Sequence, residues 1–222
     1  EFFQIITDLL ELLHKYVHPL DRWKLVHNMF ICKEAGVYLI NRLRVVHIID
    51  AELNLARREL IARRLIEHAK RHGIIPPNNF GGRNGKTAND AVMLKYLTLS
   101  IFQMQRRNFA FSDCDATACY DRILPHMLSM VYGKMGLPQK TCHWLIRALV
   151  QMQYHMQTMH GISDGVSTSD DNNTLFGIGQ GATDGPAGWL LVSAILSHLY
   201  DRRAQGCQIQ DPVTHTVQKW SH

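Results

Sequence analysis

The order of strand-like and helix-like segments is the feature of this sequence that most restricts its fold. Residues 24–49 contain three β-branched and aromatic runs separated by short polar breaks, which is typical of a small hairpin-like sheet. Other segments are apolar at helical spacing: 2–16, 51–72, 88–106, 125–135, 139–152 and 186–203. The polar stretch 161–173 is typical of turns. Strands and helices do not alternate regularly, so the sequence predicts the α+β class.

The size and the cysteine content of the chain indicate an ordinary globular protein. With 222 residues, of which 46% are hydrophobic, the chain can bury a core without disulfides or metals. Its five cysteines are odd in number and include no Cys-x-x-Cys pair, which indicates neither a disulfide framework nor a zinc ribbon. No apolar run approaches the roughly 20 residues that span a bilayer, and no signal-peptide pattern opens the chain. We therefore expect a fragment, beginning at Glu1, of an intracellular protein of the nucleus or cytoplasm that is neither secreted nor membrane-bound.

The positive charge of the chain is concentrated in its first half. Residues 1–108 carry 17 Lys and Arg against 10 Asp and Glu, whereas residues 109–222 carry 7 against 9. Within the first half, Arg57, Arg64 and Arg71 recur at seven-residue spacing along a predicted helix, away from its apolar side. A basic half beside an acidic half is typical of a polyanion contact next to a carboxylate site, and it also occurs on surfaces without ligands. We therefore divide the chain into these two segments.

Three aspartates gather where a short apolar segment ends and a helix is expected to begin. Asp113, Asp115 and Asp121 lie within residues 110–121. Carboxylates placed close together repel one another unless a divalent cation or basic partners offset their charge, which favours a site for a hard cation. The alternative is that Asp113 or Asp115 only caps the following helix, and spacing alone leaves both interpretations open.

Two glycine-rich segments are candidates for ligand binding. In residues 177–189 the glycines permit close approach of a ligand to the backbone, and Gln180 would project from the turn before a helix. The alternative is a tight loop without a ligand. Residues 81–87 end in Gly-Lys-Thr, as a phosphate-binding loop does, but Phe80 stands where that pattern requires glycine, and no strand precedes it. A Walker-type site is therefore disfavoured.

Taken in order, these segments resemble the fingers and palm of reverse transcriptases of the mobile-element type, the group that includes non-LTR retrotransposon and intron-encoded enzymes. Residues 115–121 resemble the first palm motif, in which a metal-binding Asp is followed five residues later by an aromatic residue. Residues 179–181, Gly-Gln-Gly, resemble the second palm motif. Gly185 departs from that motif, because serine is usual before its proline.

The first half of the chain carries the rest of this resemblance. Three segments resemble the connection between fingers and palm and the two fingers strands: 79–88, 31–33 and 43–46. Asn79 and Val45 stand where Gln and Pro are common in the family. The resemblance covers most of residues 24–203 and implies a right-hand polymerase of the α+β class. Residues 1–108 would then be a leading helix and the fingers, and residues 109–222 a partial palm with an acidic metal site.

The resemblance also implies roles for individual residues. Asp115 would be the catalytic metal ligand and would hold two Mg²⁺ or Mn²⁺ ions together with at least one further carboxylate. The nucleotide-binding residues would be Lys33, Arg44, Tyr120, Gln180 and Gly181. The two cations would neutralise the triphosphate, the tyrosine ring would lie beneath the sugar and disfavour a 2′-hydroxyl, and the Gln-Gly turn would position the nucleotide.

The partners that the resemblance implies are an RNA template, a DNA primer and deoxynucleoside triphosphates, with no membrane. From the charge pattern we infer that Arg57, Arg64 and Arg71 contact a phosphate backbone. We add Arg83, in the segment between fingers and palm, as a further nucleic-acid contact.

The family's third palm motif, an Asp-Asp pair on a hairpin, would supply the remaining metal ligand. The only Asp-Asp pair, Asp170-Asp171, lies in polar surroundings and precedes the second motif, so its context and its order are wrong. We therefore expect the polymerase to be truncated before its last palm strands and thumb, and these 222 residues to be inactive alone. Two alternatives stay open: a decayed or repurposed module that binds nucleic acid without catalysis, and an α+β interaction domain with no nucleic-acid role.

Overall fold

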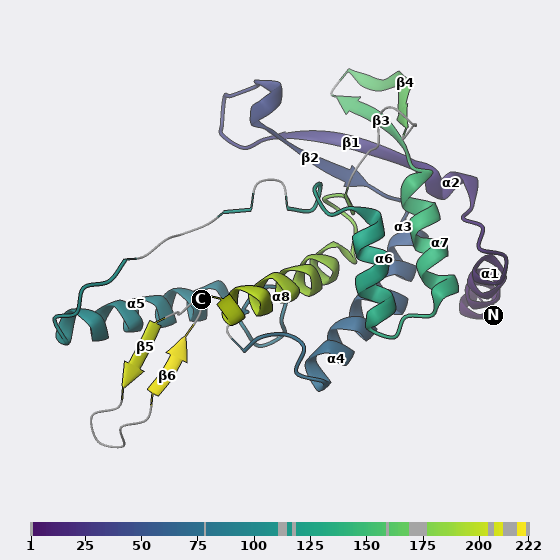
Figure 1. Ribbon diagram of the computed structural model, residues 1–222. Helices are drawn as coiled ribbons and strands as arrows, with labels where there is room; N and C mark the ends of the chain where they lie inside the picture. The colour runs from purple at the N-terminus through teal and green to yellow at the C-terminus, as the bar shows by residue number, and fades with distance from the viewer. Residues whose placement is uncertain are drawn as a thin grey trace. The chain divides into compact units, whose positions relative to one another are not determined.

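The computed structural model has mixed helix and strand content and comprises two compact units (Figure 1). It describes residues 2–77, 79–110, 115–116, 119–158, 160–168, 177–203, 207–210 and 217–220. Unit 1 comprises residues 1–68 and 118–189, and unit 2 comprises residues 69–117 and 190–222. The α+β class is confirmed. Each unit combines two separate stretches of chain, so this division differs from the charge-based division at residue 108.

A four-stranded mixed sheet forms one side of unit 1. Its strands are β1 (Leu25–Cys32), β2 (Leu43–Ile48), β3 (Gln153–Thr158) and β4 (Gly161–Thr168), in the order β2-β1-β3-β4. β1 pairs antiparallel with β2 and parallel with β3, and β3 pairs antiparallel with β4. The predicted hairpin within residues 24–49 is therefore present, although its middle run becomes a turn and a short helix, η1 (Ile40–Arg42).

Helices of unit 1 pack against one another beside this sheet. They are α1 (Phe2–Tyr16), α2 (Asp21–Lys24), α3 (Ala51–Ala56), α6 (Pro125–Lys134) and α7 (Gln139–Val150), while α4 (Arg63–Arg71) and α8 (Gly185–Arg203) each run on into unit 2. Proline begins α6 at its first position, where no intrahelical N–H bond is lost. Gly136, with φ of 87°, allows the chain to leave that helix, and α6 and α7 pack as a pair (Figure 1).

The core of unit 1 lies between β1 and α7. Trp23 and Trp144 meet edge to face with their ring centroids 6.2 Å apart. Val26, in β1, is fully buried, whereas Leu25 and Met29 on the opposite face of the same strand are exposed. The alternation shows that one face of the sheet faces the core, as the two-residue period of a strand requires.

The helix predicted over residues 51–72 is present but is not regular. Between α3 and α4 lies a π-helical segment, η2 (Arg57–Ala62), whose wide turns bond each residue to the fifth rather than the fourth along the chain. Asp50 begins α3 by accepting a 3.0 Å hydrogen bond from the Glu52 N–H. The extra residue per turn changes the face on which the residues of η2 lie, and it breaks the seven-residue register that a regular helix would keep.

Unit 2 is built around α5 (Ala88–Met104) and also contains the short antiparallel pair β5 (Cys207–Gln210) and β6 (Val217–Trp220). A capping box begins α5: the Asp90 N–H donates to the Thr87 hydroxyl, and the Thr87 N–H donates to the Asp90 carboxylate. The hydrogen bond from the Thr87 N–H, and to a smaller extent that from the Thr87 hydroxyl, lowers the pKa of Asp90. Within the parts of the chain that the structure describes, no helix has both the length and the apolar character needed to cross a membrane.

Candidate functional site: a glycine loop held on three sides

The glycine-rich loop that precedes α8 lies against the chain around Tyr120. The Ile178 N–H donates a 3.1 Å hydrogen bond to the Tyr120 carbonyl oxygen. A Cβ at Gly177 would stand 2.6 Å from the Asp121 Cα, closer than real Cβ atoms come, and the φ of Gly177 is 103°. Only glycine fits this close approach. The loop therefore brings the second predicted palm motif into contact with residues at the end of the first.

A second side of the same loop lies against the end of β2. The His47 N–H donates a 2.6 Å hydrogen bond to the Gln180 carbonyl oxygen, so the loop continues the hydrogen bonding of an edge strand. Gly181 has a φ of 125°, and a Cβ there would overlap the His47 carbonyl oxygen. Both its backbone conformation and its surroundings therefore require glycine.

The third side of the loop is held by Asn54 of α3. The Asn54 amide donates to the Gly181 carbonyl oxygen at 3.3 Å, and its oxygen accepts from the Thr183 N–H at 3.1 Å. The Thr183 hydroxyl donates to the Asn54 carbonyl oxygen at 2.6 Å. Backbone groups of the loop are thus satisfied by a helix more than 120 residues earlier in the chain.

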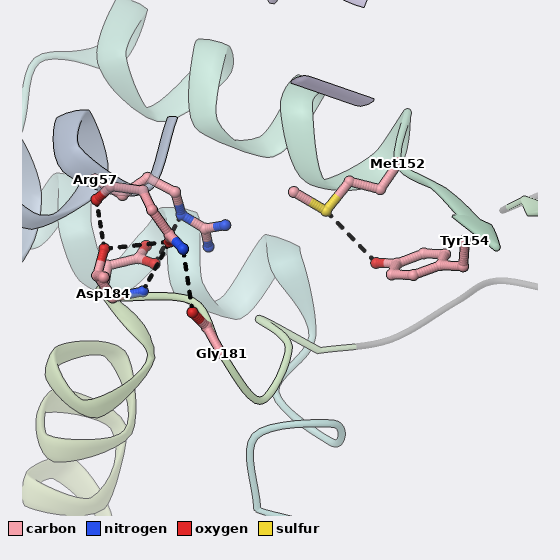
Figure 2. A network of polar contacts seen from close by, with 7 residues as sticks. Arg57, Met152, Tyr154, Gly181 and Asp184 are labelled. Carbon is pink, nitrogen blue, oxygen red and sulfur yellow. Dashed lines mark hydrogen bonds and ion pairs between the residues drawn. The ribbon is translucent and has the colours of Figure 1, made fainter. Parts of the chain in front are cut away.

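A buried ion pair closes the loop at the start of α8 (Figure 2). The Arg57 Nε lies 2.7 Å from the Asp184 Oδ1, and the two side chains are 1% and 0% exposed. None of the three guanidinium nitrogens of Arg57 and neither carboxylate oxygen of Asp184 has a hydrogen bond of good geometry among the described residues, so the contact is an ion pair. Figure 2 shows the two side chains facing each other beside Gly181. In a dry interior each charge depends on the other, because neither is solvated by water.

Tyr132 of α6 packs on the same cluster. Its ring is fully buried, and a Cβ at Gly188 would stand 3.1 Å from its hydroxyl oxygen. Burial, with the nearby Asp184 charge as a smaller cause, raises the pKa of Tyr132 well above its ordinary value. Tyr132 therefore stays a neutral phenol. The close approach of its hydroxyl to Gly188 holds the first turn of α8 near α6.

His47 joins the loop to the sheet through its side chain as well as its backbone. Its ring meets the Tyr154 ring edge to face at 5.3 Å, and the Tyr154 hydroxyl donates to the Met152 Sδ at 3.6 Å (Figure 2). Burial lowers the pKa of His47, the Asp121 charge opposes this shift, and the Arg57 charge adds to it. The imidazole is therefore held neutral next to the loop.

We expect His47 to make the stability of unit 1 depend on pH. Because the folded-state pKa lies below the ordinary 6.5, the unfolded chain binds the proton first as the pH falls below about 6.5, and stability falls with it. The variant His47→Phe keeps a ring against Tyr154 and removes the proton site. The midpoint temperature of thermal unfolding, measured from pH 7.5 to 5.5, should fall more steeply for the wild type than for the variant. Parallel pH dependences of the two midpoint temperatures would contradict this role of His47.

Three of the predicted nucleotide-binding residues lie together in unit 1. Tyr120, Gln180 and Gly181 are brought together by the contacts of the loop, and the Tyr120 ring lies within 3.6 Å of where a Gly185 Cβ would stand. Burial raises the pKa of Tyr120. Their nucleotide contacts stay predictions.

The other two predicted nucleotide-binding residues lie elsewhere on the sheet. Lys33 follows the end of β1, Arg44 lies opposite Ile31 in β2, and both cations are exposed. Arg44 is three residues before His47, so it lies roughly 10 Å along the strand from the loop. The hairpin places the two cations near each other, and their contact with a triphosphate stays a prediction.

Asp115, the predicted metal ligand, is exposed and belongs to unit 2. Asp113 lies outside the described residues, and Asp121 is half-buried in unit 1. No three His, Cys, Asp or Glu side chains converge to hold a metal ion in the described ranges. Magnesium or manganese binding by Asp115 therefore stays a prediction.

The predicted row of arginines needs a correction at Arg57. This side chain is buried and paired with Asp184, so it does not lie on an exposed face with Arg64. Arg57 lies four residues after Leu53 and four before Ile61, which are both fully buried, so it shares their core side of the helix. The π-helical turns that follow Arg57 place Arg64 on a different face. Arg64 and Arg71 are each exposed, and their contact with a phosphate backbone stays a prediction.

Arg83 stabilises the loop between α4 and α5 in unit 2. Its Nη1 donates to the carbonyl oxygens of Pro76 and Asn79, each at 3.1 Å, and the residue is half-buried. Such bonds fix the turn between α4 and α5. A contact between Arg83 and nucleic acid stays a prediction.

Sequence reasoning missed the residues that hold the loop: His47, Asn54, Asp184 and Tyr132. Asp184 stands within the glycine-rich segment, so its position could have been singled out. The other residues are distant in sequence and carry no motif. Searches for related proteins add nothing to this site, because no family model matches the chain and no curated protein matches it.

Proposed function

We propose that this chain is the fingers and front palm of an RNA-directed DNA polymerase that resembles the mobile-element reverse transcriptases. The observation that supports the proposal best is the contact of the loop 177–185 with Tyr120 on one side and with His47 of β2 on the other. Segments that the resemblance assigns to the two palm motifs and to a fingers strand therefore meet in unit 1. Gly181 of this turn is exposed, so a nucleotide could reach its backbone.

In this proposal the loop orients the incoming deoxynucleotide. Tyr120 would contact the sugar, and Gln180 would contact the nucleotide where it pairs with the RNA template. Asp115, with a further carboxylate, would hold the divalent ions, and these ions would polarise the phosphate and activate the primer hydroxyl. The chain's own part is to fix the turn, which it does through Asn54 and the ion pair between Arg57 and Asp184.

The test is primer extension by the parent polypeptide, expressed with its coding sequence continued beyond residue 222. We expect Asp115→Asn to reduce the rate of deoxynucleotide addition by about 10³-fold, because it removes a metal ligand while keeping the side-chain shape. Asp113→Asn is the matched control, because it removes the same charge two residues away, outside the motif, and should leave most of the activity. Equal losses in both variants, or full activity in Asp115→Asn, would contradict the assignment.

A second candidate function is nucleic-acid binding without catalysis. The sequence observation that favours it is that the only Asp-Asp pair, Asp170-Asp171, precedes the second palm motif. This candidate predicts salt-sensitive binding of primer–template together with no nucleotide addition by the extended parent polypeptide. The same extension assay therefore separates the two candidates.

A further inference from the structure

Two histidines lie side by side on the outer face of the sheet in unit 1. His27 of β1 and His155 of β3 occupy directly paired positions of these two parallel strands. Their ring centroids are 5.9 Å apart, with an angle of 32° between the ring planes. His27 shares its face of β1 with the exposed Leu25 and Met29, because side chains two residues apart lie on the same side of a strand. The pair therefore lies on the face opposite Val26, which is buried in the core.

The Nδ1 atoms of the two rings are not available to a ligand. The His155 Nδ1 lies 3.2 Å from the Ser163 carbonyl oxygen. A carbonyl oxygen only accepts, so this Nδ1 carries the proton of the neutral ring and leaves Nε2 with a free lone pair. The His27 Nδ1 is buried and has no hydrogen-bond partner among the described residues. No hydrogen bond therefore fixes the tautomer of His27, and its Nε2 can also be the unprotonated nitrogen.

The Nε2 atoms of both rings are open to solvent. Neither atom has a hydrogen-bond partner among the described residues, and neither is enclosed as the His27 Nδ1 is. An ion held at about 2.0–2.1 Å from two imidazole nitrogens places the ring centres roughly 5–6 Å apart. The observed spacing of 5.9 Å lies in this range. Rotation of the two side chains is therefore enough to direct both nitrogens at one ion while the strands stay in place.

The surroundings of the pair favour an ion that prefers nitrogen ligands. The strands β1, β2 and β3, which are described throughout, contain no Asp or Glu. Magnesium prefers oxygen ligands, whereas imidazole suits nickel, copper and zinc. The only cation on this face of the three strands is Arg44, which lies opposite Ile31, four residues beyond His27. At roughly 13 Å along the sheet, its repulsion of a bound ion is largely screened by salt.

We propose that His27 and His155 form a two-histidine site for a divalent transition-metal ion of the nickel, copper and zinc group. Each ring contributes its Nε2, and water completes the coordination. The Ser163 carbonyl oxygen orients His155 through Nδ1, as an outer partner commonly does for a metal-binding histidine. The proposal goes beyond the polymerase function and does not rest on it, since neither histidine belongs to the glycine loop or to the predicted magnesium site.

The ion would join the two stretches of chain that make up unit 1. His27 belongs to residues 1–68 and His155 to residues 118–189. Because unfolding separates β1 from β3, the unfolded chain does not hold the two nitrogens together, and the ion binds the folded protein more tightly. We therefore expect the ion to raise the midpoint temperature of thermal unfolding.

The test is calorimetric titration and thermal unfolding of the 222-residue chain with Ni²⁺ at pH 7.5. Nickel is the probe because it suits imidazole, whereas thiolates select softer ions. We expect His27→Gln and His155→Gln each to weaken Ni²⁺ binding at this site by about 10²-fold, because each leaves a single imidazole in place of a chelating pair. The double variant should bind no more weakly than either single variant, and Mg²⁺ at the same concentration should have no effect.

The matched control is His160→Gln. It removes an exposed imidazole from the turn between β3 and β4 and should change the Ni²⁺ affinity by less than about twofold, because it breaks no chelating pair. No Ni²⁺ binding by the wild type, unchanged binding in His27→Gln or His155→Gln, or an equal loss in His160→Gln would each overturn the proposal.

A second measurement on the wild-type protein needs no variant and so does not depend on whether the variants fold. Paramagnetic Ni²⁺ should broaden the amide resonances of β1 and β3 around His27 and His155 first. Broadening confined to α4, where His68 and His72 are four residues apart in a stretch rich in Lys and Arg, would overturn the proposal.

Discussion

Replacing Asp184 with alanine is expected to lower the free energy of unfolding of unit 1 by about 3–5 kcal/mol. The substitution leaves the Arg57 guanidinium, 1% exposed, without the carboxylate 2.7 Å away and without access to water. An unpaired buried charge is among the most destabilising changes that a single substitution makes. Urea unfolding followed by circular dichroism would measure the loss. Under the proposed polymerase function, the same variant should also weaken nucleotide binding, because the glycine loop is no longer anchored.

The neighbouring Arg58 provides the control for this prediction. It pairs with Glu59 at 2.8 Å, but the two side chains are 56% and 37% exposed, so Arg58→Ala should cost far less than Asp184→Ala. The double variant Arg57→Met and Asp184→Leu removes both buried charges and should regain much of the stability lost by Asp184→Ala. A double variant as unstable as the sum of its two single variants would show that the two charges do not depend on each other.

The second large effect is expected at Gly181. The variant Gly181→Ala should cost about 2–4 kcal/mol, because it combines a backbone conformation that only glycine adopts readily with an overlap between the new Cβ and the His47 carbonyl oxygen. Since the clash is with backbone, no side-chain rotation relieves it, and the loop must move away from β2. The same unfolding measurement applies, together with amide exchange at His47, whose N–H is bonded to the loop.

Gly133 is the matched control for this substitution. It lies within α6, where an added Cβ would meet nothing within 4 Å. Gly133→Ala should therefore raise the free energy of unfolding by about 0.5–1 kcal/mol, because alanine loses less backbone entropy in a helix. If both variants changed stability alike, the close approach of the loop to β2 would be wrong.

Periodicity predicted the elements whose side chains carry a clear pattern. The hairpin of β1 and β2 and the helices α5, α6, α7 and α8 all lie where the sequence analysis expected them. The strand β4 was missed, because Gly161–Thr168 is polar, lies at the edge of the sheet and owes its place to backbone bonds with β3. Backbone pairing of this kind leaves little trace in the side-chain pattern.

At the candidate site, too, some features were predicted from the sequence and others were not. The loop around Gln180 and the segment at Tyr120 were found because each carries its own motif. The pairs that hold them together, Asn54 with Thr183 and Arg57 with Asp184, could not be predicted from the sequence, because each contact joins positions about 130 apart. Arg57 was misplaced because a seven-residue spacing assumes a regular helix, and the π-helical segment breaks that regularity.

Unit 1 is assembled from two separate stretches, residues 1–68 and 118–189, so its sheet is completed only late in protein synthesis. While the ribosome makes the first stretch, β1 can pair with β2, but its other edge has no partner until β3 emerges more than 120 residues later. Such long-range pairing folds slowly and exposes an open strand edge in the meantime. The glycine loop is translated later still, so this strand edge stays open until most of unit 1 has been synthesised.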